Sequence, residues 1–599
     1  MDVAGISAKD KWERVSTAKR AGVLAPLFSI YSRQSAGIGD LRDLRLLVDW
    51  AAKTGDSIIQ LLPMNESGSL FCPYDACSSF ALEPAYLYLE GFLVSRSIAR
   101  KIERLKKLFP AGATYINYAV KNGKLGLLRE IFQEDDCAAS DSLRSFQEEN
   151  AYWLRDFALY KAIKNSCCGR PWLEWEEGLK NCAPEALEAF SRAHQGEINF
   201  EVWLQWQLFR QFRETKTYAR DRGILIKGDL PVLVSLDSAD VWAQRKFFKL
   251  ELAAGDPPDM YCAKGQRWGM PTYRWEDIAA DGYRYLKEKL RYAGNFYDLL
   301  RIDHVAGLFR IWSIPCGEPL ENQGLNGFFD PADEKLWDAQ GRKILQVLLD
   351  STEMLLCAED LGVIPKCCTQ ALEDFRIPGN DVQRWAKDWK IKHDFLTPAE
   401  YRRFSVAMLS THDTTNWPAW WENEAGTVDE ALMMRRSIGR VDYHSVQDRL
   451  FDAQTSRHGR LRWLNSVDST EKLAGILGKR KEEILDFVEL YENSFQEKEK
   501  LWRQLKLKGP MRKVCDAEIL RAALKVSLEA NSVFCVNTLI DWLYLAGIFP
   551  GDPYPYRINT PGTVSGKNWS LTIPLSLEEL SKHKVCAEIK KLITASGRR

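Results

Sequence analysis

The segment at residues 300–312 reads LRIDHVAGLFRIW, and it combines a run of apolar residues with three ionisable side chains. The apolar residues are typical of a strand that is buried on both faces, as in a parallel sheet covered by helices. Arg301, Asp303 and His304 interrupt the run, and burying an ionisable group without a partner costs free energy. We therefore interpret the segment as a buried strand that carries functional polar side chains to a site at its end.

Further strand candidates occur along the chain, and the later ones pass from apolar residues to Asp, Glu, His or Gly. Residues 41–52 have apolar side chains at helical spacing and lie between the first two candidates, so the chain begins as a β-α-β unit. This alternation predicts a parallel α/β sheet or barrel, whose strand ends gather catalytic groups on one side. The candidates are residues 23–30, 57–63, 224–234, 299–309, 354–362, 406–413 and 532–543.

Two long segments interrupt this alternation. Residues 85–196 are rich in Leu, Glu, Lys and Arg and are mostly helical in pattern, and residues 422–530 carry mixed charges. Mixed charges of this kind are typical of a solvated helix surface, which is our interpretation of the second segment. The predicted divisions are the start of a catalytic domain, a helical insertion, the continued domain with the catalytic residues, a second helical insertion and a final segment, at residues 1–84, 85–196, 197–421, 422–530 and 531–599.

The composition excludes several classes of partner. The chain has 599 residues, with 82 basic and 82 acidic side chains and a formal net charge of +0, so no global field attracts nucleic acid or an anionic membrane. It has no apolar run of the roughly 18 residues needed to span a bilayer, and its start lacks a secretory apolar region. We expect a cytoplasmic protein with a neutral or small partner, no nucleic-acid partner and no membrane partner.

The 14 cysteines indicate reduced thiols and no disulfide framework. Two adjacent pairs begin at Cys167 and Cys367, other cysteines lie in apolar strand-like runs, and no C-x-x-C pattern occurs. Cys72 and Cys77 share a loop, but no cluster of His or Cys residues accompanies them, so no metal site is predicted. The 21 tryptophans fill cores first, and some remain available to stack on the apolar faces of sugar rings.

Three acidic residues follow strand candidates: Asp303 in RIDHV, Glu359 in CAEDLG and Asp413 in STHDTT. They are 56 and 54 residues apart in the sequence, whereas one βα unit of an eight-unit barrel takes about 30 residues. Each gap fits two units, or one unit with an insertion, so the three strand ends are predicted to converge on one mouth. The alternative is that each acid caps the helix that follows it.

Converging carboxylates favour glycosyl transfer. Breaking an acetal requires one carboxylate that attacks or shields the anomeric carbon and one carboxylic acid that protonates the leaving oxygen. Asp303 suits the first task, because Arg301 on the same strand face would keep it ionised and oriented. Glu359 suits the second, because burial or the charge of Asp303 would raise its pKa. His412 and Asp413 would hydrogen-bond substrate hydroxyls and stabilise positive charge at the reacting carbon.

Eight motifs resemble the 4-α-glucanotransferases, the amylomaltase or disproportionating-enzyme family, and they run in family order from about residue 24 to 572. The motifs are GIGDL (37–41), CPYDACSSFALEP (72–84), KGDLPVLVSLDSADVW (227–242), GDPPDMYCAKGQRWGMPTYRW (255–275), RIDHVAGLFRIW (301–312), AEDLG (358–362), STHD (410–413) and INTPGTVSGKNW (558–569).

The resemblance implies a (β/α)8 TIM barrel of the α-amylase superfamily, with large and mostly helical insertions, that acts on α-1,4-glucans without a cofactor. On matching motif positions, Asp303 would be the nucleophile, Glu359 the acid/base, and Asp413 the third acid, which grips sugar hydroxyls. For two of the residues named next, a structural role is the alternative to sugar binding: packing of a loop for Trp268 and capping of a helix for Asp237. The substrate-binding residues implied by the resemblance are Tyr74, Asp229, Asp237, Asp259, Trp268, Arg301, His304 and His412.

Three positions depart from the family pattern. Glu83 stands where Asn is common before Pro84, Cys72 stands where many members have Ser, and WSIP at residues 312–315 replaces the WWIP of some bacterial members. The insertion at 85–196 and the KGDLP and FRIW segments are more similar to the plant cytosolic disproportionating branch, which favours branched or hetero-glycan acceptors. Only about 23 residues precede the first predicted strand, so we expect the starch-binding modules of that branch to be absent.

The leading hypothesis is a 4-α-glucanotransferase that transfers α-1,4-glucan segments from maltooligosaccharides or glycogen to an acceptor sugar through a glycosyl-Asp303 intermediate. An α-glucan hydrolase on the same barrel is the alternative, which the sequence separates poorly from a transferase. A silent glucan-binding protein is disfavoured because all three acids are present. A metal-dependent hydrolase is disfavoured because ligand spacing such as H-E-x-x-H is lacking. Donor and acceptor preference and oligomeric state stay open.

Overall fold

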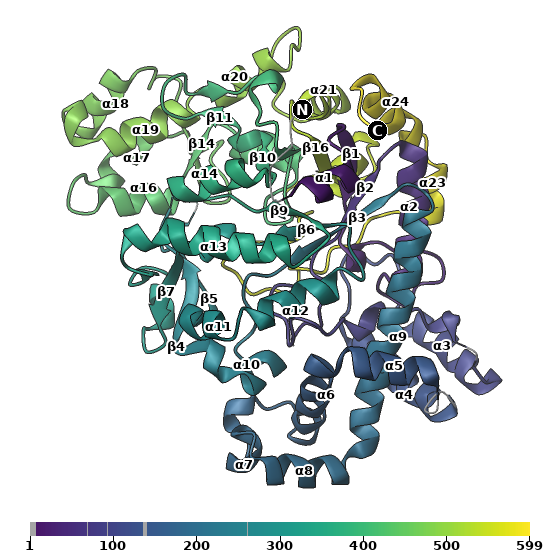
Figure 1. Cartoon of the computed structure of the whole chain (residues 1–599). Coiled ribbons are helices and arrows are strands. Elements are labelled where there is room, and N and C mark those ends of the chain that lie inside the picture. Colours follow the sequence, from purple (N-terminus) through teal and green to yellow (C-terminus); the bar gives the residue numbers. More distant parts are fainter. Residues whose placement is uncertain (1–7, 69, 93, 136–139, 260–261) are drawn as a thin grey trace.

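Eight parallel strands form the centre of the protein (Figure 1). The computed structural model describes residues 8–68, 70–92, 94–135, 140–259 and 262–599. The strand order is β10-β13-β16-β1-β2-β3-β6-β9, and every register in it is parallel. The two ends of this order meet, since the N–H of Ala358 donates to the carbonyl of Pro378 at 2.7 Å. The sheet therefore closes into a barrel.

The barrel strands are short, and nearly all of their residues are buried, as expected for strands covered on both faces. This arrangement confirms the predicted (β/α)8 fold. The strands are β1 (Arg20–Leu24), β2 (Ile58–Gln60), β3 (Leu225–Leu230), β6 (Leu299–Ile302), β9 (Leu355–Ala358), β10 (Gly379–Val382), β13 (Ser405–Met408) and β16 (Phe534–Thr538).

β1 and β10 differ from the prediction. β1 ends at Leu24 and not at residue 30, because Pro26 has no N–H to continue the ladder and Leu27–Ser29 turn as a 3-10 helix. β10 was not predicted, because Gly, Asn and Asp are poor strand formers. Its strand conformation is imposed by pairing with β13, from Gly379 opposite Ser405 to Val382 opposite Met408.

The segment at residues 300–312 is not one strand, which corrects the interpretation made from the sequence. β6 ends at Ile302, His304 has a φ of 42° in the left-handed region, and Val305–Leu308 form a 3-10 turn. The chain then enters β7 (Ile311–Pro315) of a separate antiparallel sheet. Asp303 and His304 therefore lie in the turn between two sheets. The other strands of the second sheet are β4 (Phe248–Asp256), β5 (Gln266–Tyr273) and β8 (Phe328–Asp330).

The segment between β2 and β3 is mostly helical (Figure 1). Its last helix, α9, has 26 residues and leads back into the barrel, so the predicted boundary at residues 196/197 falls at the start of this helix. The helices are α3 (Arg96–Leu108), α4 (Ala119–Glu134), α5 (Asp141–Glu149), α6 (Ala151–Ser166), α7 (Glu177–Lys180), α8 (Pro184–Ala193) and α9 (Gln195–Arg220).

Glu83, one of the departures from the family pattern, joins this helical insertion to the barrel. Its buried carboxylate accepts hydrogen bonds from Lys121 Nζ of α4 at 2.9 Å and from Ser67 Oγ at 3.1 Å. Lys121 also lies 3.5 Å from the buried carboxylate of Glu66. A lysine on α4 thus accounts for the acidic residue at position 83.

Part of the second helical segment forms an arm with its own hydrophobic core (residues 427–495), drawn in light green at the upper left of Figure 1. The later helices α20 (Glu497–Gln504) and α21 (Ala517–Glu529) contribute instead to the main core. The arm consists of β14 (Thr427–Asp429), α16 (Glu430–Ser437), α17 (Tyr443–Leu450), β15 (Arg460–Arg462), α18 (Thr470–Leu477) and α19 (Leu485–Ser494).

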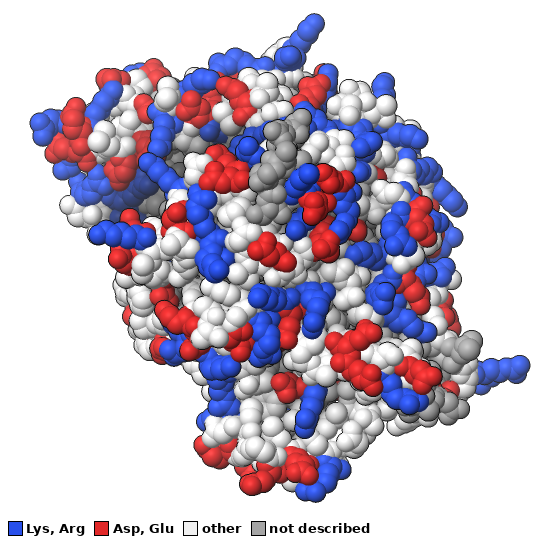
Figure 2. All heavy atoms as spheres, in the orientation of Figure 1, with Lys and Arg blue, Asp and Glu red and all other residues white. Residues whose placement is uncertain are grey.

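Acidic and basic side chains are interspersed over the visible face of the molecule, in agreement with the balanced composition (Figure 2). Within the described ranges, no helix combines the length and apolarity that crossing a bilayer requires. The remaining helices and strands are α1 (Lys9–Val15), α2 (Leu41–Thr54), α10 (Ala239–Ala243), α11 (Trp275–Ala280), α12 (Arg284–Ala293), α13 (Trp337–Asp350), α14 (Lys366–Phe375), α15 (Trp417–Ala419), α22 (Leu539–Leu545), α23 (Leu577–Lys582), α24 (Val585–Ala595), β11 (Lys387–Asp388) and β12 (Asp394–Phe395).

Candidate active site

A long cleft opens at the carboxyl ends of the barrel strands. Its volume is about 1690 Å³, larger than the ~300–1,000 Å³ of typical small-molecule pockets. Asp303, Glu359 and Asp413 all line it, just after β6, β9 and β13. The structure therefore brings the three predicted acids together in a cleft that suits an oligomeric substrate.

Asp303 is held by an ion pair with Arg301, whose Nη1 lies 2.8 Å from Asp303 Oδ1. The same nitrogen donates to the two carboxylate oxygens of Asp229, at 2.6 and 2.8 Å. The Asp229 side chain is fully buried and does not line the cleft. Asp229 thus acts behind the cleft wall, where it fixes the arginine that orients Asp303.

The pKa of Asp303 is raised to about 6, mainly by burial. The negative charges of Asp229 and Glu359 raise the pKa further, while Arg301 and His304 lower it. Arg301 orients the carboxylate as predicted from the sequence. The ion pair lowers the pKa of Asp303, as expected, but desolvation outweighs it, so the pKa stays above its ordinary value.

Glu359 accepts two backbone hydrogen bonds. Oε2 accepts from the N–H of His304 at 2.9 Å, and Oε1 accepts from the N–H of Leu361 at 2.9 Å. The left-handed backbone of His304 aims the first of these N–H groups at the carboxyl group. Burial raises the pKa of Glu359 and the neighbouring Asp360 adds to the rise, although Arg301 and His304 oppose it. Glu359 is therefore suited to hold a proton.

Asp413 has the opposite electrostatic state. Its Oδ2 lies 3.1 Å from His412 Nε2, and its Oδ1 accepts from Asn559 Nδ2 at 2.8 Å. Burial alone would raise the pKa of Asp413, but His412 and Asn559 together lower it to about 2. The carboxylate in turn raises the pKa of His412 above its ordinary value, against the effect of burial. Asp413 is thus ionised across the physiological range.

Tyr74 contributes an aromatic wall beside these acids. Its hydroxyl donates to Asp229 Oδ2 at 2.8 Å, and its ring is stacked on His412 with centroids 5.2 Å apart. Trp569 lies next to both rings, 5.7 Å from Tyr74 and 6.0 Å from His412. The predicted aromatic platform is therefore part of a cluster of three rings that lines the cleft.

On the opposite side, Trp268 meets His304 edge to face, with centroids 5.0 Å apart. Both rings line the cleft, as does Asp259, which accepts a hydrogen bond from the N–H of Cys262 at 2.6 Å. The strand β5 carries Trp268, so the antiparallel sheet supplies this wall.

Asp237, a predicted substrate-binding residue, does not line the cleft. Its carboxylate accepts hydrogen bonds from the Tyr160 hydroxyl at 2.9 Å and the Trp172 N–H at 3.2 Å, and it pairs with Lys164. These partners belong to the helical insertion. The side chain therefore joins the insertion to the loop after β3, which differs from both the predicted sugar contact and the predicted helix cap.

Several cleft residues were missed by sequence reasoning. Asn559 lies in the INTPGTVSGKNW motif but received no role, and Asp256, 4.0 Å from His304 Nε2, lies in another of the quoted motifs. The arm also forms part of the wall, which corrects its interpretation as a solvated surface. Its cleft residues include Leu432, Arg435, His458 and Arg460. The described residues contain no group of three or more His, Cys, Asp and Glu side chains suited to a metal ion.

A closed parallel barrel whose strand ends carry three carboxylates into a long cleft defines a carbohydrate-active enzyme of the glycosidase type. The family model described as 4-alpha-glucanotransferase matches residues 25–576, so the chain belongs to this family. It is a transglycosylating enzyme that acts on glucan, and a hydrolase is not favoured.

Named relatives agree with this assignment. The 4-alpha-glucanotransferase of Chlamydia pneumoniae is 32% identical over 590 residues, which cover 97% of each chain. The rice 4-alpha-glucanotransferase DPE2 is 26% identical over 69% of this chain and 59% of its own. In fold, the amylomaltase from Streptococcus agalactiae in complex with acarbose has a TM-score of 0.70 at 22% identity and covers 97% of this chain and 99% of its own.

Proposed function

We propose that the enzyme passes α-1,4-glucan segments between maltooligosaccharides or glycogen through a covalent bond to Asp303. Glu359 is the acid/base in this scheme, and Asp413 stabilises the sugar. The observation that carries the proposal is the electrostatic difference among the three acids. Burial raises the pKa of Asp303 to about 6 and also raises the pKa of Glu359, whereas Asp413 has a pKa of about 2.

In the first step, ionised Asp303 attacks the anomeric carbon while Glu359 donates its proton to the oxygen of the leaving glucan. The bond from the anomeric carbon to that oxygen breaks, and a glycosyl ester forms on Asp303. Positive charge builds on the sugar in the transition state. The permanent charge of Asp413 and the fixed ring of His412 are placed in the same cleft to stabilise that state.

In the second step, Glu359 is a carboxylate and removes the proton from the 4-hydroxyl of an acceptor glucan. The acceptor oxygen attacks the anomeric carbon, the ester bond breaks, and Asp303 is released. Two displacements at one carbon retain the α configuration. Water competes with the acceptor, so transfer requires that the cleft be filled by sugar.

The proposal includes a reducing compartment such as the cytoplasm. Thirteen cysteines lie in the described part of the chain, and each of these is a free thiol, which supports this placement. Fractionation of cells with an antibody to the protein would test it, and recovery in an oxidising compartment would contradict it.

Incubation with maltotriose tests the transfer reaction. Longer oligosaccharides should appear together with glucose, and glucose without longer products would contradict transfer. The roles of the acids are tested by Asp303→Asn, which should lower kcat on the order of 10⁴-fold or more while the variant still unfolds in one cooperative thermal transition. A variant that keeps substantial activity would refute the role of Asp303.

A further inference from the structure

The cleft continues from the three acids to the junction between the barrel and the arm. Arg384 connects the site of the acids to this junction. It donates hydrogen bonds to the hydroxyl of Thr415 at 3.1 Å and to the carbonyl of Thr415 at 2.7 Å, and Thr415 lies two residues after Asp413. Trp420, Glu424 and Arg460 line the cleft at this junction. The reaction scheme leaves these three side chains unused.

An unusual turn places two of them. Residues Trp420–Glu424 form a π-helical turn directly after α15. Turns of this kind are rare in proteins, and those that occur are often found at functional sites. Trp420 and Glu424 line the cleft from this turn. Trp421 and Glu422 do not line the cleft. Trp421 is fully buried, and Glu422 accepts a hydrogen bond from the N–H of Cys515 at 2.9 Å.

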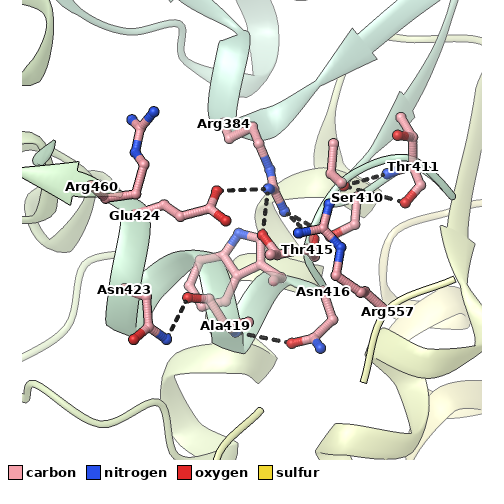
Figure 3. Close-up of polar contacts among 12 residues, drawn as sticks. Arg384, Ser410, Thr411, Thr415, Asn416, Ala419, Asn423, Glu424, Arg460 and Arg557 are labelled. Carbon is pink, nitrogen blue, oxygen red and sulfur yellow. Dashed lines mark hydrogen bonds and ion pairs between the residues drawn. The ribbon is translucent and has the colours of Figure 1, made fainter. Parts of the chain in front are cut away.

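Arg384 fixes the position of the turn. Its side chain is 3% exposed, and it also donates to the Ser410 hydroxyl at 3.0 Å. The guanidinium lies 5.5 Å from the ring centre of Trp420 and 3.7 Å from Glu424 Oε2 (Figure 3). Because the hydrogen bonds of Arg384 go to the barrel, the arginine holds Glu424 in place while leaving its oxygens accessible.

Glu424 is 21% exposed, and its ion pair with Arg384 is longer than a hydrogen bond. In the described part of the chain, its carboxylate accepts no hydrogen bond, so its lone pairs are available to a ligand in the cleft. Arg460 of β15 stands on the other side of Glu424 (Figure 3) and is held by the hydroxyl and carbonyl of Thr427 at 3.0 and 3.1 Å. An oriented acceptor and an oriented donor therefore both line the cleft at this junction.

The charges at this junction are paired, Arg384 with Glu424 and Arg460 with Asp429, the latter at 3.9 Å. A pocket of paired charges attracts no ion strongly, but it offers acceptors and donors to the hydroxyl groups of a neutral polyol. Trp420 is buried to 5% exposure, but it lines the cleft beside these charges and adds an apolar contact for a sugar ring.

We propose that Trp420, Glu424 and Arg460 form a glucan subsite that takes a glucosyl residue beyond the one held at Asp413. The proposal rests on the 4-α-glucanotransferase activity and deepens it, because it assigns these residues to the recognition of longer glucans. Each residue acts on binding and positioning of the chain and takes no part in the bond-making steps.

The test compares Glu424→Ala and Arg460→Ala with the wild type on a series from maltotriose to maltoheptaose. A charge-assisted hydrogen bond predicts that kcat/KM falls about tenfold more for maltoheptaose than for maltotriose in each variant. The matched control is Glu422→Gln, from the same turn but with its side chain bonded to Cys515. It should keep the wild-type ratio between the two substrates.

An equal loss for all chain lengths, or the same length-dependent loss in Glu422→Gln, would overturn the subsite. A binding measurement gives a second readout. In an Asp303→Asn background, Glu424→Ala should raise the Kd for maltoheptaose about tenfold, and an unchanged Kd would also overturn the proposed subsite. Failure of the wild type to lengthen maltotriose would contradict the transferase function instead, so the two failures are distinguishable.

Discussion

At the residue scale, the surroundings of each carboxyl group decide its chemistry. Asp303 and Asp413 are the same residue type in the same cleft, yet the pKa of the first is about 6 and that of the second is about 2. Burial acts on both, but Asp413 has His412 and Asn559 as partners, whereas Asp303 shares its site with the charges of Asp229 and Glu359. In the proposed reaction, Glu359, whose pKa burial also raises, is the group that keeps its proton, and Asp303 must lose its proton before it can attack.

The raised pKa of Asp303 predicts the acid limb of the pH profile. In the proposed mechanism Asp303 is the nucleophile and must be ionised, so kcat/KM should fall roughly tenfold per unit below about pH 6. Stability should change in the opposite direction. Because the pKa is higher in the folded state than in the unfolded chain, the contribution of Asp303 to the free energy of unfolding decreases as the pH rises from its ordinary pKa to about 6.

This prediction is checked with kcat/KM for maltotriose and with denaturant unfolding of the wild type and Asp303→Asn between pH 4 and 8. The difference in stability between the two proteins should change mainly below pH 6. An acid limb near the ordinary pKa of Asp, with no pH-dependent difference in stability, would contradict the assignment.

Asn559 is predicted to keep Asp413 ionised and oriented. Its Nδ2 donates to Asp413 Oδ1 at 2.8 Å, and a hydrogen bond to a charged group is worth about 1.5–3 kcal/mol. Asn559→Ala should therefore lower kcat/KM about 10- to 100-fold and raise the pKa of Asp413. The control is Asn568→Ala in the same loop, whose side chain bonds to Thr563. Similar kcat/KM values in both variants would show that the bond to Asp413 has no special role.

At the scale of elements, the helical insertion between β2 and β3 acts as a structural part of the barrel, and it is joined to the barrel by polar contacts. Asp237 shows this for the loop after β3, where it bonds to Tyr160, Lys164 and Trp172. Glu83 shows it for the loop after β2, where it bonds to Lys121. Glu83 is the buried one of the two, and its contact fixes how the insertion is placed on the barrel, because a buried charge tolerates few alternative arrangements.

Removal of the Glu83 carboxylate is expected to be costly. Glu83→Ala leaves Lys121 without one of its two acidic partners in a buried site and should lower the free energy of unfolding by about 3–5 kcal/mol. The matched control is Glu130→Ala. Glu130 lies on α4, as Lys121 does, and pairs at 2.6 Å with Lys101 on the exposed surface. Its removal should lower the free energy of unfolding by about 0–1 kcal/mol. Denaturant unfolding measures both, and equal losses would refute a structural role for the buried pair.

At the scale of the whole molecule, the arm meets two rim loops of the cleft. Arg435 bonds to the carbonyl of Ala263 in the loop between β4 and β5. His458 is stacked on Tyr554, with ring centroids 3.6 Å apart and an angle of 4° between the planes. His458, Tyr554 and Arg435 all line the cleft. Together these contacts connect the arm across the mouth, which favours retention of sugar and exclusion of water.

Loosening the arm should therefore raise hydrolysis relative to transfer. In the double variant His458→Ala/Tyr554→Ala, we expect the glucose released without chain extension to increase several-fold per bond cleaved, because water reaches the glycosyl-enzyme more easily. Product analysis with maltotriose measures this ratio. His444→Ala, an exposed histidine of α17 that does not line the cleft, should keep the wild-type ratio. An unchanged ratio in the double variant would contradict a role for the arm in excluding water.

Much of the fold followed from local patterns. Apolar runs at β2, β3, β6, β9, β13 and β16 identified strands because burial on both faces requires apolar side chains whatever the neighbours are. β10 could not be found in this way, since its Gly, Asn and Asp residues form a strand only when β13 supplies the hydrogen bonds. The end of β6 was missed for a similar reason, because the apolar residues after Asp303 continue into a different sheet.

By itself, the sequence determined a parallel α/β fold and the three candidate acids with their order along the chain, and its family motifs implied the barrel, because each of these depends on residues that are adjacent in sequence. Only the tertiary structure decided that Asp229 lies behind the cleft and Asp237 outside it, that the arm forms a wall, and that Asp303 and Asp413 differ in pKa. These properties depend on burial and on charges contributed by distant segments. A sequence pattern records which groups are available, whereas their solvation and their partners exist only once the chain has folded.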